Sequence, residues 1–292
     1  MSTKSTLDSV LAQYETSKQS GSSSTFKMSQ DERMKKYFAA ILKDNEKQGQ
    51  RKLRILPTND GSSPFKEVWF HEILLDGKWQ KFYDPGKNDN ERSPLTEVHE
   101  ELMSTGKESD KELAKQYKAR KFYIVKLIDR DNENDGVKFW RFKHNYKNEG
   151  VLDKIIPIWR AKGDITDPEN GRDIILELAK AKTPKGATYT VIQTIMHDDP
   201  TPLHKSKDIS SGWITDELGW DDVYSKKPVE YLEAIARGET PKWDNDQGKY
   251  VYGNNTSGEE SFGGSTKKVV QEPKKVLVDP QANAEVDEDL PF

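Results

Sequence analysis

Three pairs of strand-like segments, each joined by a short turn-forming stretch, most constrain how this chain can fold. In the first pair the turn is Asp76-Gly77, a composition typical of a tight type I′ hairpin. Connections this short join antiparallel neighbours, because a parallel pair needs a crossover of a dozen or more residues. The three pairs lie within residues 67–85, 121–145 and 173–196.

One further strand and several helices complete the expected inventory. RKLRIL at 51–56 alternates polar and apolar residues and stops at Pro57, as a half-buried strand does. Residues 95–119 are rich in Glu, Lys and Leu and predict one or two surface helices, and helices are also expected at 228–238 and at 150–163, the latter interrupted at Pro157. Strand pairs with helices between them predict a mainly β fold with an OB-fold core, a five-stranded antiparallel barrel.

Composition divides the chain into three parts. Only 33% of the 292 residues are hydrophobic, which is enough apolar material for one core and polar flanks. We expect an N-terminal arm at 1–27, a core domain at 28–245 with a helical insertion at about 92–119, and a disordered tail at 246–292 rich in Gly, Ser, Asn and charge. Within the arm, four apolar residues have the spacing of an amphipathic helix: Leu7, Val10, Leu11 and Tyr14.

Several classes of protein are excluded or disfavoured by what the sequence lacks. The absence of Cys rules out disulfides and thiolate metal sites. No apolar run reaches the roughly 18 residues of a membrane span, and the first residues lack the apolar region of a signal peptide, so we expect a cytoplasmic protein without a membrane partner. No nucleotide-binding or nucleophile motif occurs, and we predict a protein that is not an enzyme and binds no cofactor. A nuclease built on scattered carboxylates remains an alternative.

Charge is distributed unevenly along the chain, although the net charge is only -4. From Gly253 onward there are eight acidic residues and four lysines, whereas Lys111–Lys147 contains eleven Lys or Arg and five acidic residues. The same basic stretch is rich in Phe, Tyr and Trp. Aromatic side chains interleaved with cations suit single-stranded nucleic acid, since unpaired bases stack on rings while cations neutralise phosphates.

Several segments form a recognisable series along the chain: Lys4-Ser5-Thr6 before a short helix, RKLRILP at 51–57, His71 with Gly77-Lys78-Trp79, the basic strand around 118–128, and Trp140-Arg141-Phe142. In this order they resemble the single-stranded DNA-binding (helix-destabilising) proteins of T-even-like bacteriophages. The resemblance implies an OB-fold that binds single-stranded DNA, an arm that binds the neighbouring subunit through Lys4, Ser5 and Thr6, and an acidic tail that recruits replication proteins. It also implies a DNA groove formed by Arg54, Lys118, Arg120, Lys121, Tyr123, Trp140, Arg141 and Lys143.

The chain departs from that family at the family's zinc site, which uses one His and three Cys. His71 is kept, but the matching positions are Asp84, Ser93 and Thr96. Zinc sites of this kind need thiolate or imidazole donors, so we predict no structural metal. We expect packing at helical spacing to hold this region instead, through Leu95, Val98 and Leu102.

The last ten residues, NAEVDEDLPF, combine four side-chain carboxylates with apolar residues, Leu290 and Phe292, at the end. They resemble the C-terminal tip of bacterial single-stranded DNA-binding proteins, which docks on partner enzymes. The resemblance implies a partner-binding role for Asp287, Glu288, Asp289, Leu290, Pro291 and Phe292.

The sequence therefore predicts a cooperative, phage-encoded single-stranded DNA-binding protein that coats and protects DNA in replication, recombination and repair. Its expected partners are single-stranded DNA, further copies of itself, and replication or recombination proteins. Two alternatives stay open at this point, a phage nuclease that uses an OB-fold to hold its substrate, and an RNA-binding or annealing protein.

Overall fold

The computed structural model describes residues 30–43, 45–75, 77–183, 186–224, 226–244 and 249–251. The fold is mainly β with helices, as predicted. The strands are β1 (Tyr37–Phe38), β2 (Gln48–Ile55), β3 (Lys66–Leu75), β4 (Lys78–Tyr83), β5 (Arg120–Asp129), β6 (Val137–Lys143), β7 (Arg172–Lys182), β8 (Thr188–Pro200), β9 (Lys242–Asp244) and β10 (Lys249–Val251). The helices are α2 (Gln30–Lys35), α3 (Pro85–Asp89), α4 (Pro94–Ser104), α5 (Glu108–Tyr117), α6 (Val151–Lys162), α7 (Lys207–Ile214) and α8 (Val229–Ala236), with short 3-10 turns η1 (Glu133–Asp135) and η2 (Trp220–Asp222).

The three predicted hairpins are confirmed as β3–β4, β5–β6 and β7–β8, all antiparallel. The main sheet has eight strands in the order β1-β6-β5-β2-β7-β8, and β3 joins it by pairing with the first half of β5. The second half of β5 pairs with β2. Within the described residues no ladder joins the edge strands β1 and β8, so the sheet is larger than the predicted five-stranded barrel and is not closed.

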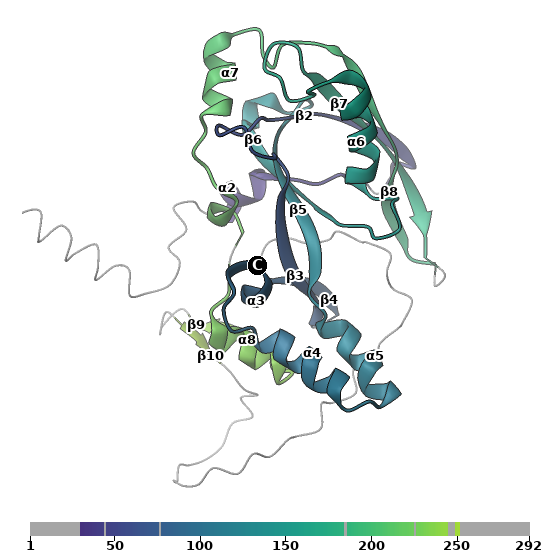
Figure 1. Ribbon diagram of the computed structural model, residues 1–292, viewed down its shortest axis with the longest axis vertical. Helices are drawn as coiled ribbons and strands as arrows, with labels where there is room; N and C mark the ends of the chain where they lie inside the picture. Colours follow the sequence, from purple (N-terminus) through teal and green to yellow (C-terminus); the bar gives the residue numbers. More distant parts are fainter. Residues whose placement is uncertain are drawn as a thin grey trace, which may run out of the picture.

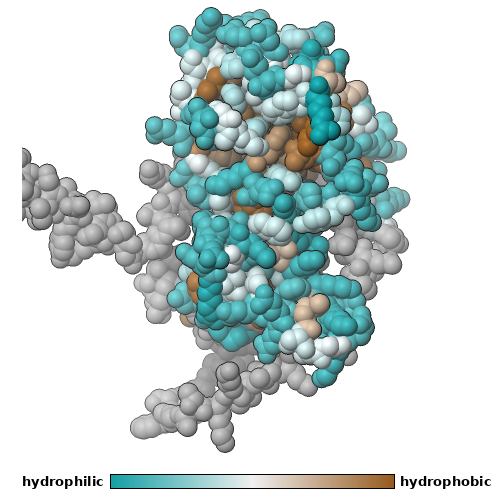
Figure 2. All heavy atoms as spheres, viewed as in Figure 1, coloured by the Kyte–Doolittle hydropathy of each residue, from teal (hydrophilic) through white to brown (hydrophobic). Residues whose placement is uncertain are grey.

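β3 and β5 connect two regions of the molecule (Figure 1). One region contains β2, β6, β7 and β8 with α6 and α7, and the other contains α3, α4, α5, α8 and the small β9–β10 sheet. On the face shown in Figure 2, apolar surface gathers over the first region, and the second is largely hydrophilic. Helices α4 and α5 fall within the range 92–119 that was predicted as a helical insertion, and they lie at one end of the long strands.

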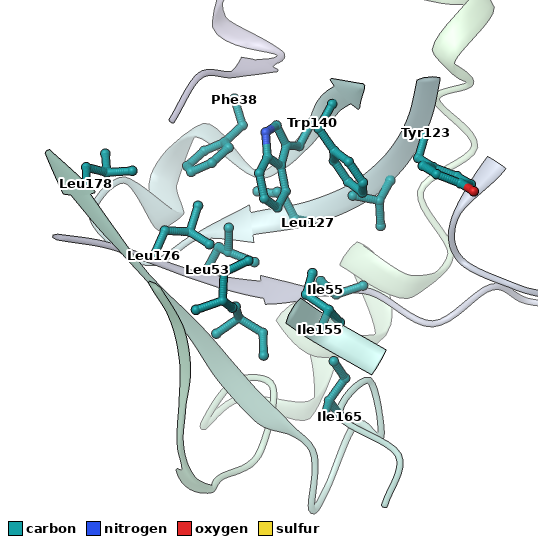
Figure 3. Packing of buried hydrophobic residues seen from close by; sticks show 14 of the residues in the cluster. Phe38, Leu53, Ile55, Tyr123, Leu127, Trp140, Ile155, Ile165, Leu176 and Leu178 are labelled. Atoms are coloured by element: carbon teal, nitrogen blue, oxygen red, sulfur yellow. The ribbon is translucent and has the colours of Figure 1, made fainter. Parts of the chain in front are cut away.

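The main core lies in the first region, where one face of the sheet packs against α6 (Figure 3). Apolar residues alternate along β2, β5 and β7, as the strand period requires. The largest buried members include Leu53, Ile55, Leu127, Trp140, Ile155 and Leu176. A second cluster buries the opposite face of β3, β5 and β6 under residues 218–224, and a third joins β3, β4, α4 and α8.

Two local predictions need correction. Helix α6 runs unbroken through Pro157, because Pro157 is exposed and the carbonyl that loses its amide partner can be hydrated. Strand β10 lies inside the range predicted as a disordered tail. It pairs with β9, and Tyr250 packs edge-on against Tyr231 at 4.7 Å, a contact that sequence periodicity does not reveal. The arm at 1–27 and residues 252–292 of the tail lie outside the described residues.

None of the helices in the described ranges is long and apolar enough to cross a membrane.

Gly171, just before β7, lies where no side chain fits. A Cβ at this position would be 2.4 Å from the carbonyl oxygen of Asp167 and 2.6 Å from that of Ile165. Both are backbone atoms, so relief requires the loop itself to move. We expect Gly171→Ala to lower the free energy of unfolding by about 1–3 kcal/mol in urea titrations. Gly212→Ala is the matched control, since a Cβ there meets nothing within 4 Å on helix α7 and should raise stability by about 0.5–1 kcal/mol. Equal stability of the two variants would contradict this interpretation.

Candidate nucleic-acid interface

The predicted binding residues divide between the two faces of the three-stranded segment β3–β5–β6. Because neighbouring residues on a strand point to opposite faces, Lys121 and Tyr123 share one face and Arg120 the other. The inner face, which packs on the main core, also carries Trp140. The outer face carries Phe122 in the second cluster. A single flat groove therefore cannot use all of the predicted residues.

An aromatic strip lies at the end of the inner face. It consists of Trp69, Lys121, Tyr123, His144 and Tyr146. Tyr146 is the most exposed large side chain of the strip, with 71% of its surface accessible. Its ring meets the His144 ring edge-on at 4.3 Å, and the Tyr123 hydroxyl lies 3.3 Å from His144 Nδ1. Along the strip the rings therefore run from the buried Tyr123, through His144, to the exposed Tyr146.

Lys121 gives the aromatic strip its positive charge. Lys121 pairs with Trp69 across the β3–β5 ladder, and its Nζ lies 5.7 Å from the Trp69 ring centroid. It also lies 3.0 Å from a carboxylate oxygen of Glu67, and this hydrogen bond raises the pKa of Lys121 against a smaller opposing effect of burial. Burial raises the pKa of Tyr123. Lys121 is therefore a cation at neutral pH, which suits a phosphate, and Tyr123 is an uncharged side chain beside it.

The outer face carries a basic band around the buried ring of Phe122. The band consists of Lys81, Arg120, Arg141 and Lys143. Lys81, Arg141 and Lys143 have their charged groups 5.8, 5.9 and 5.9 Å from the Phe122 centroid. Arg120 and Lys143 both contact Glu72, at 3.1 and 2.6 Å. Cations over a ring are held in place while keeping part of their surface for an anion.

Residues 218–224 and Lys226 cover the rest of the outer face. Trp220 stacks on Tyr83 with ring centroids 5.6 Å apart, and the Lys226 amine lies 4.3 Å from the centroid of Tyr83. Tyr224 packs against Phe70 at 6.2 Å. The rings of this face are therefore closed to bases, and the outer face offers charge and no stacking platform.

Three predicted contacts lie inside the protein. Arg54 is fully buried, donates to Asp173 at 3.0 Å and also donates to the carbonyl of Thr201, so its guanidinium is committed to the interior. Trp140 is 3% exposed and packs against Phe38 and Phe142. Tyr123 is 7% exposed, so its ring is buried and it contributes to the strip through its hydroxyl, 3.3 Å from His144 Nδ1. We therefore correct the predicted groove by removing Arg54 and Trp140 from it.

Lys118, another of the predicted binding residues, is exposed at the end of α5, just before β5. Trp69 and His144 were not predicted as binding residues. Alternation along the chain could have found them, since it places Trp69 on the same face as His71, and His144 on the same face as Phe142. The predicted self-association residues Lys4, Ser5 and Thr6 and the partner-binding residues 287–292 lie outside the described residues.

In the described parts of the chain, no group of three or more His, Asp or Glu side chains is arranged to hold a metal ion. In comparisons with known proteins, no family model matches the chain and no curated protein matches it.

Proposed function

We propose that this protein binds single-stranded DNA, with bases stacked on the aromatic strip and phosphates neutralised by neighbouring lysines. The observation that carries the proposal is the exposed ring of Tyr146, next to His144 and Tyr123 and on the same face as Lys121 over Trp69. Exposed rings beside cations favour unpaired strands, because the bases of a duplex are already stacked on each other.

The basic band on the outer face supports the same proposal through electrostatic attraction of phosphates. Its cations lie on the opposite face of the same single sheet, so their electrostatic field adds to that of Lys121 and Lys118 at the strip. We propose that the sheet is an OB-fold elaborated by extra strands. Its hairpins agree with that architecture, as does the pairing of β5 with β6 on one edge and with β2 and β3 on the other.

The biological setting is part of the same proposal. A protein of this kind coats and protects single strands in phage replication, recombination and repair, and it binds cooperatively through the arm around Lys4, Ser5 and Thr6. The acidic residues 287–289 and the adjoining Leu290, Pro291 and Phe292 supply a handle for replication proteins. These roles rest on the sequence resemblance alone.

Tyr146→Ala tests the stacking surface directly. Loss of one exposed ring should weaken binding of a fluorescein-labelled oligothymidylate by about 1–3 kcal/mol, with little change in the dependence of affinity on salt. Lys121→Ala should instead reduce the slope of log K against log[salt] by roughly 0.7, since one phosphate contact is lost. Both are measured by fluorescence anisotropy at two or more salt concentrations.

Trp79→Ala is the matched control, because Trp79 is also an exposed ring, 40% accessible, but lies on β4 away from the strip. Its affinity should equal that of the parent protein. Equal affinities of the Tyr146 and Trp79 variants would mean that the binding site lies elsewhere.

Titrations with duplex DNA and RNA, followed by incubation with Mg²⁺, separate the proposed function from the two alternatives. An RNA-binding protein would prefer RNA, and only a nuclease would shorten the oligonucleotide.

A further inference from the structure

Four polar side chains meet in the interior where β3 passes the helical insertion. They are His71 on β3, Asp84 and Ser93 directly before α3 and α4, and Thr96 in the first turn of α4. His71 and Asp84 have no exposed surface, and Ser93 is 5% exposed. Buried polar groups are costly unless each is paired, so this group needs a complete set of partners.

The imidazole of His71 has both nitrogens engaged. Nδ1 lies 2.7 Å from the carbonyl oxygen of Tyr117, which can only accept, so Nδ1 carries a proton and donates. Nε2 faces Asp84 Oδ1 at 3.3 Å and Ser93 Oγ at 3.4 Å. One ring therefore links β3 to the end of α5 and to the starts of α3 and α4.

The carboxylate of Asp84 is the acceptor of the group. It accepts from the backbone amides of Gly86 at 3.1 Å and Lys87 at 3.3 Å, and from the Thr96 hydroxyl at 3.4 Å. Burial alone would raise the pKa of Asp84, but the hydrogen bonds from His71 and Ser93 outweigh it and hold that pKa below its usual value. Asp84 is thus an anion that caps α3.

The polarity of the helix ends matches the side chains that meet them. The positive N-terminus of α3 faces the carboxylate, Ser93 accepts from the amide of Thr96 as the cap of α4, and the negative C-terminus of α5 faces the proton on His71 Nδ1. Three helix ends are satisfied by one connected set of hydrogen bonds.

These four positions are those that match the zinc ligands of the resembled family, so the fit of a metal can be tested. The separations of 3.3 to 3.4 Å between donor atoms are close to the roughly 3.3–3.8 Å between ligands of a tetrahedral zinc. The donors do not fit. Two are neutral hydroxyls, and the single carboxylate already accepts two backbone amides. A divalent cation would have to displace these bonds for a poor ligand set.

We propose that His71, Asp84, Ser93 and Thr96 form a metal-free clasp that fastens the helical insertion to β3 by hydrogen bonds. The clasp keeps the geometry of a metal site and replaces its chemistry with helix capping. It is independent of nucleic-acid binding, because it concerns how α3, α4 and α5 are held. It adds hydrogen bonds to the packing that was expected to hold this region, in which Leu95 is fully buried.

Thermal unfolding of the full chain, with and without a strong zinc chelator, is the first test. The melting temperature of the parent protein should not change with chelator, and the purified protein should contain well under one zinc per chain. Asp84→Asn should lower the melting temperature by about 10 °C and Ser93→Ala by about 3 °C. Glu97→Gln is the control on the same helix, since Glu97 is exposed and, within the described residues, forms an ion pair with Arg92 only.

Stoichiometric zinc in the parent protein, or a fall in its melting temperature with chelator, would overturn the proposal. So would clasp variants as stable as the Glu97 variant. A second test uses the variant with Asp84→Cys, Ser93→Cys and Thr96→Cys. Because His71 Nε2 already points into the group, this variant should bind one zinc and become sensitive to chelator. Failure to bind zinc in a folded triple variant would contradict the claimed geometry.

Discussion

Replacing Asp173 by asparagine is expected to lower the free energy of unfolding by about 3–5 kcal/mol, because it leaves the fully buried guanidinium of Arg54 without its counter-charge. Asp173 is 5% exposed and holds two guanidinium groups. Arg54 Nη1 lies 3.0 Å from Oδ1, and Arg130 donates from Nε and Nη2 at 3.0 and 2.9 Å. The two arginines are close enough to repel each other once the carboxylate is neutral.

The network around Asp173 also joins distant parts of the chain. It connects β2 through Arg54, the end of β5 through Arg130, and β7 through Asp173 itself. The same arginines donate to the carbonyls of Thr201 and Leu203 after β8. Loss of the anion should therefore loosen the connection after β8 as well as the sheet.

Asp198→Asn is the control for this prediction. Asp198 pairs with Lys52 on the surface, and its side chain is 44% exposed. Exposed ion pairs contribute about 0–1 kcal/mol, so this change should have little effect on the free energy of unfolding. Urea unfolding followed by circular dichroism measures both variants. A loss below about 1 kcal/mol for Asp173→Asn would mean that the buried arginines find other partners or reach water.

Most of the strands were predictable because the relevant signals are local. Each hairpin joins neighbouring segments through a short turn, so alternation and turn composition suffice. Closure of the sheet is not a local property. It depends on how β1 and β8, at the two ends of the ladder, approach each other, and no spacing in the sequence reports that distance.

The candidate site was only partly predictable, for a reason visible along β5. Alternation correctly separates Tyr123 from Phe122, but both faces of this strand are covered, one by the main core and one by residues 218–224. A strand buried on both faces gives no sequence signal for which face meets water. Likewise, Arg54 reads as a surface cation until its partner Asp173, 119 residues further on, is known.

For the clasp, the sequence predicts which ligands are absent but not which interactions are present. Sequence alone indicated that thiolate ligands are missing and that a metal is disfavoured. It did not indicate what replaces them, because the hydrogen bond from His71 to the carbonyl of Tyr117 spans 46 residues. Polar residues at helix starts are ordinary caps in a sequence, and only their convergence on one imidazole gives them a common role.

Trp140→Ala is expected to reduce stability by about 3–5 kcal/mol, as for other large aromatic side chains removed from a core. Figure 3 shows Trp140 among Phe38, Leu127 and Ile55 in the interior, and its ring lies 5.8 Å from Phe38 and 4.7 Å from Phe142. It is 3% exposed, so no base can stack on it without unpacking the core.

The experiment must separate folding from binding, since the resemblance predicted Trp140 as a DNA contact. Trp140→Phe keeps an aromatic side chain of smaller volume and should cost less stability, on the order of 1–2 kcal/mol, while leaving DNA affinity unchanged at a temperature where the variant is folded. Trp79→Ala, which removes an exposed indole, should change the free energy of unfolding by less than about 1 kcal/mol. A folded Trp140→Phe variant with parental stability and clearly weaker DNA binding would return Trp140 to the interface, because a ring confined to the core cannot alter affinity without altering stability.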